Sequence, residues 1–194
     1  MKKTLMIIGI LLLIIALPFS SMVMETMTAQ TDPVKEVREG DVIFQTSQSQ
    51  QSPLIQIATR AKISHCGIIV MKDGEPYVLE TLKTLVITPL DKFIARGKGG
   101  RYWLKRSNIE NIKIKYDSYL GKPYDLAFKF DNDKFYCSEL IYDIYKNQLG
   151  IELCEPKKVS DYLILGTDKL PMIEKAMKKR GITKEQYAVC LVLK

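Results

Sequence analysis

The chain has 194 residues, of which 46% are hydrophobic and 26% charged, so it is long enough for one well-buried domain and too short for two large ones. The formal net charge of +7 is spread along the sequence, with its densest clusters at Lys157-Lys158 and Lys178-Lys179-Arg180. No interleaved aromatic platform accompanies this charge, which argues against nucleic-acid binding. Solvated lysines are the first interpretation, and attraction to anionic cell-wall polymer or phospholipid headgroups is the second.

Residues 1–24 have the pattern of a signal peptide or an N-terminal membrane anchor. Lys2-Lys3 precedes an uncharged stretch whose centre, Leu5 to Leu17, is almost wholly aliphatic. Pro18 favours cleavage, whereas a stretch close to the ~20 residues of a spanning helix favours an anchor. Either outcome places the domain outside the cytoplasm, in the periplasm, in the cell envelope or in the medium.

The remainder reads as a polar linker over residues 25–39 and one α+β domain over residues 40–194. In chain order we expect a strand over 42–46, a short helix that opens at Pro53, a β-meander of strands over 64–71, 77–82 and 85–88, a helical turn over 89–96, a strand over 102–105, helices over 109–120, 136–149 and 172–179, and a strand over 187–193.

The four cysteines, Cys66, Cys137, Cys154 and Cys190, are even in number, so an exported chain could pair them in disulfides. Their density is low, however, and Cys66 and Cys190 lie in apolar, strand-like runs that are typical of small buried side chains. Zinc is disfavoured, because the cysteines lack close paired spacing and the chain has a single histidine.

That histidine, His65, lies in the first strand of the meander. If Asp73-Gly74 forms a two-residue turn, Lys72 pairs with Glu75, and the same register places Gly67 opposite Glu80. His65 and Glu80 then share one face of the hairpin as diagonal neighbours, while Cys66 faces the other way. A slip of one residue would separate them, so the register is a strict test.

Glu80 has two interpretations. An exposed, solvated carboxylate is the ordinary state of a strand glutamate. Here, however, its neighbours on the same face are Val78 and Leu82, and the histidine is within reach. A carboxylate in this position would orient the imidazole and favour its protonated form.

Cys137 also has two interpretations. It shares a helical stripe with Leu140, Ile141 and Ile144, as a core residue would. Asp131-Asn132-Asp133, however, supplies cap-type residues just upstream, which places Cys137 near the first turn of the helix. The backbone amides and positive dipole there stabilise a thiolate and can receive an oxyanion. The acids that flank Cys154 would raise the pKa of that thiol instead.

Two sets of motifs resemble known families. One set resembles the nucleophile region of the NlpC-type cell-wall cysteine peptidases: Gly121-Lys122-Pro123-Tyr124-Asp125, followed by Phe135-Tyr136-Cys137-Ser138-Glu139-Leu140-Ile141-Tyr142. In those enzymes the cysteine precedes the histidine. Here the order is reversed: Arg38-Glu39-Gly40-Asp41-Val42-Ile43-Phe44 comes first, then Ser64-His65-Cys66-Gly67-Ile68, a glutamate strand and finally the cysteine helix. This order is similar to the circularly permuted papain-like branch, which includes the YiiX and YaeF proteins and, more distantly, lecithin retinol acyltransferase.

The resemblance implies a papain-like α+β core, in which a helix with the nucleophile packs on an antiparallel sheet. It implies that Cys137 is the nucleophile, His65 the general base and acid, and Glu80 the residue that orients His65. Tyr124 matches a tyrosine near the oxyanion site, and a core aromatic is its other interpretation. No metal or organic cofactor is required.

The expected activity is that of an exported cysteine hydrolase that cleaves an amide through an acyl-enzyme. Its partner would be a peptide, a peptidoglycan fragment or an acyl lipid. A lipid acyl hydrolase or acyltransferase is the alternative, favoured by a site that opens into an apolar channel, whereas a small polar pocket would favour a peptidase. A non-catalytic envelope-binding module is the third possibility.

Overall fold

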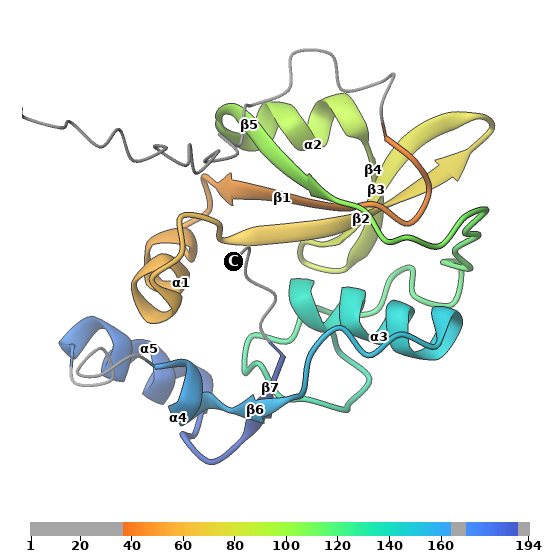
Figure 1. Ribbon diagram of the computed structural model, residues 1–194. Helices are drawn as coiled ribbons and strands as arrows, with labels where there is room; N and C mark the ends of the chain where they lie inside the picture. Colours follow the sequence, from red (N-terminus) through yellow and green to blue (C-terminus); the bar gives the residue numbers. More distant parts are fainter. Residues whose placement is uncertain (1–36, 164–169, 190–194) are drawn as a thin grey trace, which may run out of the picture.

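A computed structural model describes residues 37–163 and 170–189 (Figure 1). Its centre is a five-stranded antiparallel sheet in the order β4-β3-β2-β1-β5. The strands are β1 (Val42–Ser47), β2 (His65–Lys72), β3 (Glu75–Thr81), β4 (Leu85–Pro89) and β5 (Gly97–Lys105). The helices are α1 (Ser52–Thr59), α2 (Leu90–Arg96), α3 (Cys137–Leu149), α4 (Val159–Tyr162) and α5 (Pro171–Arg180). The predicted α+β class is confirmed.

The β2–β3 hairpin has the predicted register. Lys72 pairs with Glu75, and the ladder continues to Ile68 opposite Leu79. Asp73 and Gly74 both have positive φ, 53° and 84°. This is required in a two-residue hairpin turn whose twist matches the right-handed twist of the flanking strands. The hairpin therefore brings the start of β2 beside the end of β3.

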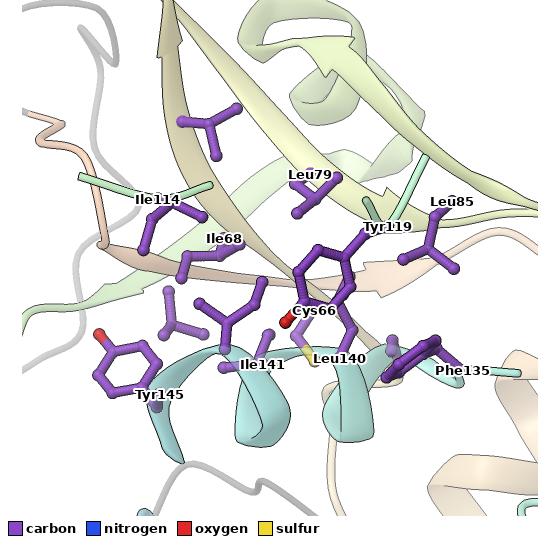
Figure 2. Packing of buried hydrophobic residues seen from close by; sticks show 14 of the residues in the cluster. Cys66, Ile68, Leu79, Leu85, Ile114, Tyr119, Phe135, Leu140, Ile141 and Tyr145 are labelled. Atoms are coloured by element: carbon purple, nitrogen blue, oxygen red, sulfur yellow. The ribbon is translucent and has the colours of Figure 1, made fainter. Parts of the chain in front are cut away.

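The two faces of the sheet carry separate cores, because side chains alternate along each strand. Ile43, Ile69 and Val78 pack with Leu90 and Phe93 of α2. The opposite face carries Cys66, Ile68 and Leu79, which lie against Leu140, Ile141 and Tyr145 of α3; Figure 2 shows this packing. Figure 1 shows α2 on one side of the sheet and α3 on the other.

α3 forms where the apolar stripe predicted a helix. Cys137, Leu140, Ile141 and Ile144 are all buried, and the helix ends at Gly150 with φ 70°, a left-handed conformation that glycine adopts without strain. A long apolar face against the sheet accounts for its stability better than propensity does.

The helix predicted over 109–120 is wrong. Buried residues alternate there, at Ile112 and Ile114, as in an extended chain. The backbone amides bond to side chains instead of to a helical turn: Ile114 N–H donates to Glu39 Oε1 (2.8 Å) and Lys115 N–H to Gln148 Oε1 (2.8 Å). The segment contains three isoleucines, and β-branched side chains favour extended backbone. Their spacing matched a helix, but it did not determine the structure.

The elements after α3, which are α4, α5 and two short strands, form a small C-terminal layer beside the sheet (Figure 1). β6 (Lys157–Lys158) pairs with β7 (Tyr187–Ala188), and α1 and α5 contact each other at the end of the sheet where β2 begins. The predicted leader, most of the linker and Cys190 lie outside the described residues. Within the described residues, no helix is long and apolar enough to cross a membrane.

Gly67 is required where the two strands approach. A Cβ on this residue would overlap Val78 Cγ1 and would lie 3.0 Å from the carbonyl oxygen of Leu79. Val78 is fully buried and cannot move aside. We therefore expect Gly67→Ala to lower the free energy of unfolding by about 1–3 kcal/mol, measured by urea titration. Lys72→Ala, at the exposed end of the same strand, is the control, and an equal effect of the two substitutions would contradict this account.

Candidate active site

His65 is held by the carboxylate of Glu80. Nε2 of His65 lies 2.8 Å from Oε2 of Glu80, which is fully buried, and the His65 side chain is 12% exposed. The other carboxylate oxygen of Glu80 accepts a hydrogen bond from Nη2 of Arg96, at the end of α2. The Phe93 ring stacks against the imidazole, with ring centroids 5.8 Å apart. The predicted contact between His65 and Glu80 is therefore present.

Cys137 is the first residue of α3, and it lies beside the first residues of β2, His65 and Cys66. Its thiol interacts by hydrogen bonds with the side chains of both His65 and Cys66. Since Nε2 of His65 is engaged by Glu80, Nδ1 is the ring nitrogen left for the sulfur. Cys137, His65 and Glu80 thus form one connected chain of polar groups, brought together from α3, β2 and β3.

The electrostatics of this chain favour a thiolate and an imidazolium. The hydrogen bond from Cys66 and the charge of His65 hold the pKa of Cys137 well below its usual value, despite burial. Burial opposes the charge on His65, but Cys137 and Glu80 outweigh it and raise the pKa of His65 from 6.5 to about 9. Burial also opposes the charge on Glu80, yet His65 and Arg96 lower its pKa. A thiolate is the reactive form of cysteine.

The start of α3 is organised differently from the prediction. The N-cap is Tyr136, which makes no side-chain cap bond, so the expected capping by Asp131-Asn132-Asp133 is wrong. Instead, the Glu139 carboxylate reaches back from the first turn and accepts hydrogen bonds from the backbone N–H groups of Asp131 and Tyr136. This is one half of a capping box, and it fixes the loop that leads into Cys137.

The chain beyond β7 also contacts the start of α3. Ser138 Oγ donates to the carbonyl of Val189 (2.8 Å), and Val189 N–H donates to Oη of Tyr136 (2.6 Å). These bonds place the C-terminal layer directly beside Cys137.

Tyr124, the tyrosine of the Gly-x-Pro-Tyr motif, is near enough to Cys137 for the charge of the thiolate to affect its pKa. Its N–H donates to the carbonyl of Lys83, which ties the loop before α3 to the β3–β4 connection. Burial, and then the negative charge of Cys137, raise the pKa of Tyr124 well above 10, so its phenol stays protonated and able to donate.

Two hollows meet at His65. One is a cavity of about 190 Å³, next to Cys137, with mostly apolar walls from α1, α4 and α5. The other is a more polar groove of about 660 Å³, whose lining includes Gln48, Lys83, Arg96 and Tyr124. Ile55, Ser64 and His65 line both hollows, whereas Cys137 lines only the apolar cavity.

Sequence reasoning missed three neighbours of the site. Because side chains alternate along β2, Cys66 points to the face of the sheet away from His65. α3 packs on that face and brings Cys137 into contact with Cys66, a contact that appears only once the helix is placed on the sheet. Arg96 and Phe93 come from α2, whose position over the hairpin is a tertiary contact without a sequence signal. The predicted effect of acids on Cys154 is confirmed, since burial and then Glu152 raise the pKa of that thiol.

Comparisons with known proteins agree with this geometry. Residues 36–186 match a family model described as permuted papain-like amidase enzyme, YaeF/YiiX, C92 family. The uncharacterized protein YiiX of Escherichia coli strain K12 is 35% identical over 148 residues, which cover 73% of this chain and 71% of that protein. A crystal structure described as metalloprotein yiiX, from Escherichia coli O157:H7, superposes with a TM-score of 0.68 at 34% identity and covers 78% of this chain and 88% of that chain.

The word metalloprotein describes the Escherichia coli relative. In residues 37–163 and 170–189 of this chain, no three His, Cys, Asp or Glu side chains are grouped so that they could hold a metal ion. The side chains of these residues therefore do not fit a metal site.

The ion pair predicts unusual thiol reactivity. At pH 6, Cys137 should react with iodoacetamide at least roughly tenfold faster than Cys154, because one thiol is ionised and the other is not. Glu80→Gln should move the Cys137 reaction to higher pH, since His65 then loses a partner that favours its charge. Peptide mapping by mass spectrometry measures both rates. Equal rates for the two cysteines at pH 6 would contradict the ion pair.

Glu139 predicts a pH effect on stability. Burial raises the pKa of Glu139 to about 8 in the folded protein, so the unfolded chain releases its proton first as the pH rises from 4.5. Its carboxyl therefore opposes folding increasingly between pH 4.5 and 8. Glu139→Gln keeps an oxygen for the two N–H groups and should become more stable relative to wild type across this window, measured by thermal unfolding. Glu110→Gln, at an exposed position, is the control. A difference in unfolding temperature between Glu139→Gln and wild type that stays constant from pH 4.5 to 8 would refute the prediction.

Proposed function

The chain belongs to the family of permuted papain-like amidases, and we propose that it hydrolyses an amide bond with Cys137 as nucleophile, His65 as general acid and base, and Glu80 as the residue that orients His65. The observation that carries the assignment is the connected chain of hydrogen bonds from Cys137 through His65 to Glu80. Family membership supports the reaction class, and the geometry supports the choice of residues.

The first half of the reaction forms an acyl-enzyme. The Cys137 thiolate attacks the carbonyl carbon, and a C–S bond forms while the carbonyl oxygen gains negative charge. The first N–H groups of α3 have no acceptor within the helix, so they are available to that oxygen, and the Tyr124 phenol is the second candidate donor. The His65 imidazolium then gives its proton to the leaving nitrogen as the C–N bond breaks.

The second half releases the acid. Neutral His65 takes a proton from water, the hydroxide adds to the thioester, and the C–S bond breaks to restore the thiolate and the imidazolium. Glu80 stabilises the charged ring in both halves and stays ionised throughout, because its pKa is lowered by His65 and Arg96. Arg96 contributes by holding the carboxylate, so we regard it as a positioning residue.

An extracytoplasmic site of action is part of the proposal. It rests on Lys2-Lys3 and the aliphatic run that follows, which are typical of an export signal. The substrate would then be a component of the cell envelope or its surroundings. A peptide, a peptidoglycan fragment and an acyl lipid all present a suitable carbonyl.

An acyl hydrolase or acyltransferase is the second candidate, favoured by the apolar cavity beside Cys137. It differs from the amidase in the bond that is broken, or in an alcohol or amine that replaces water as acceptor. The residues and their roles are the same in each case.

The triad predicts a graded loss of turnover. Cys137→Ser and His65→Ala should each lower kcat/KM by at least about 1000-fold, and Glu80→Gln by roughly 10²–10⁴-fold, measured on any amide or ester substrate identified by mass-spectrometric screening of envelope fragments and acyl lipids. Cys154→Ser is the matched control and should keep full activity. Wild-type turnover in Cys137→Ser would refute the assignment, and an unreactive Cys137 in the wild type would favour the non-catalytic binding module.

A further inference from the structure

We propose that Cys137 is a site of reversible oxidation, at which a hydroperoxide converts its thiol and the thiol of Cys66 into a disulfide that blocks the nucleophile. Cys66 is then the resolving thiol, the one that closes the disulfide. The inference goes beyond the proposed function, because it uses the reactivity of the Cys137 sulfur and not the hydrolysis of an amide.

The two thiols meet where β2 and α3 begin. Cys66 is the second residue of β2, and Cys137 is the first residue of α3. Their side chains share a hydrogen bond, and the backbone N–H of Cys66 also donates to the Cys137 sulfur. Both residues belong to the core between the sheet and α3, where Figure 2 shows Cys66. The structure has both as thiols, and a disulfide requires the sulfurs to approach from this contact to about 2.05 Å.

Cys137 is the thiol that a peroxide oxidises first. Its neighbours hold its pKa well below the usual value, and the thiolate is the form of cysteine that reacts with peroxides. The residue also lines a cavity of about 190 Å³. A water molecule takes up about 30 Å³ in the liquid, so the cavity has room for a small hydroperoxide next to the sulfur.

The oxidation proceeds in two steps that balance. The Cys137 thiolate attacks one peroxide oxygen, an S–O bond forms as the O–O bond breaks, and the second oxygen leaves and takes the proton of His65. The Cys66 sulfur then attacks the sulfur of the Cys137 sulfenic acid. An S–S bond forms, the S–O bond breaks, and the departing hydroxide takes the Cys66 proton to become water. Two electrons pass from the two thiols to the peroxide.

The position of Cys66 decides what happens to the oxidised nucleophile. A sulfenic acid that meets more peroxide becomes a sulfinic acid, which thiol reductants do not restore. A disulfide with Cys66 stops the oxidation earlier, and a dithiol reductant returns both thiols by exchange. Cys66 thus converts a permanent loss of the nucleophile into a reversible one.

Cys154 is the matched control for Cys66. It lies in the segment between α3 and β6, and the cavity whose lining includes Cys66 and Cys137 does not include it. Burial and then the charge of Glu152 raise the pKa of its thiol. Cys154 therefore lacks both the position and the ionised form that the proposed chemistry needs.

Mild oxidation of the full chain tests the inference without a substrate. After treatment with a small molar excess of hydrogen peroxide, non-reducing peptide mapping by mass spectrometry should find the peptides of Cys66 and Cys137 joined, with the loss of two hydrogens. Iodoacetamide labelling of Cys137 should fall, and dithiothreitol should restore it. Cys137 joined to Cys154 or Cys190 instead, or oxidised to a sulfinic acid without a disulfide, would overturn the inference.

A pair of variants isolates the role of Cys66. Cys66→Ser keeps a hydroxyl donor beside the Cys137 sulfur and removes the resolving thiol. After peroxide treatment, dithiothreitol should restore at least about fivefold more Cys137 labelling in wild type and in Cys154→Ser than in Cys66→Ser, each relative to its own labelling before oxidation. Equal recovery in Cys66→Ser would overturn the inference. If Cys66→Ser does not fold, the wild-type peptide map decides the question.

The same experiment separates this inference from the proposed function. Cys137 that reacts with iodoacetamide but forms no disulfide with Cys66 would overturn the inference alone. Cys137 that reacts with neither iodoacetamide nor peroxide would overturn the inference and contradict the proposed function as well.

Discussion

The site depends on one imidazole that bonds a sulfur on one side and a carboxylate on the other, out of contact with most of the solvent. Each partner is costly to bury as an ion alone, and together they offset that cost. The β2–β3 hairpin supplies the histidine and the carboxylate, and α3, which packs on one face of the sheet, supplies the thiol from its first residue. Any shift of the hairpin register or of α3 would break the chain of polar groups.

The parts of this arrangement that are local in sequence could be predicted. Asp73-Gly74 determines the turn, the turn determines the register, and the register brings His65 to Glu80. The stripe that begins at Cys137 determines α3. The contact of Cys137 with His65 is different, since two strands and a helix must pack before it forms, and it was expected from the family resemblance rather than from spacing.

The errors and omissions are tertiary in origin. Residues 109–120 have helical spacing, but the sheet surface and the side chains of Glu39 and Gln148 stabilise extended chain there. The helix start is fixed by Glu139 within α3 and by Val189 from the far end of the chain, not by the polar residues just before it. Arg96 and Cys66 touch the site only because α2 and α3 cover opposite faces of one sheet.

A single histidine makes the central claim directly measurable. In protein without affinity-tag histidines, one ¹⁵N-imidazole signal reports the titration of His65. The account predicts a pKa near 9 in the wild type and a value closer to 6.5 once Cys137→Ala removes the thiolate. A wild-type pKa near 6.5 that Cys137→Ala leaves unchanged would show that the sulfur and the ring do not form an ion pair, and would contradict the account.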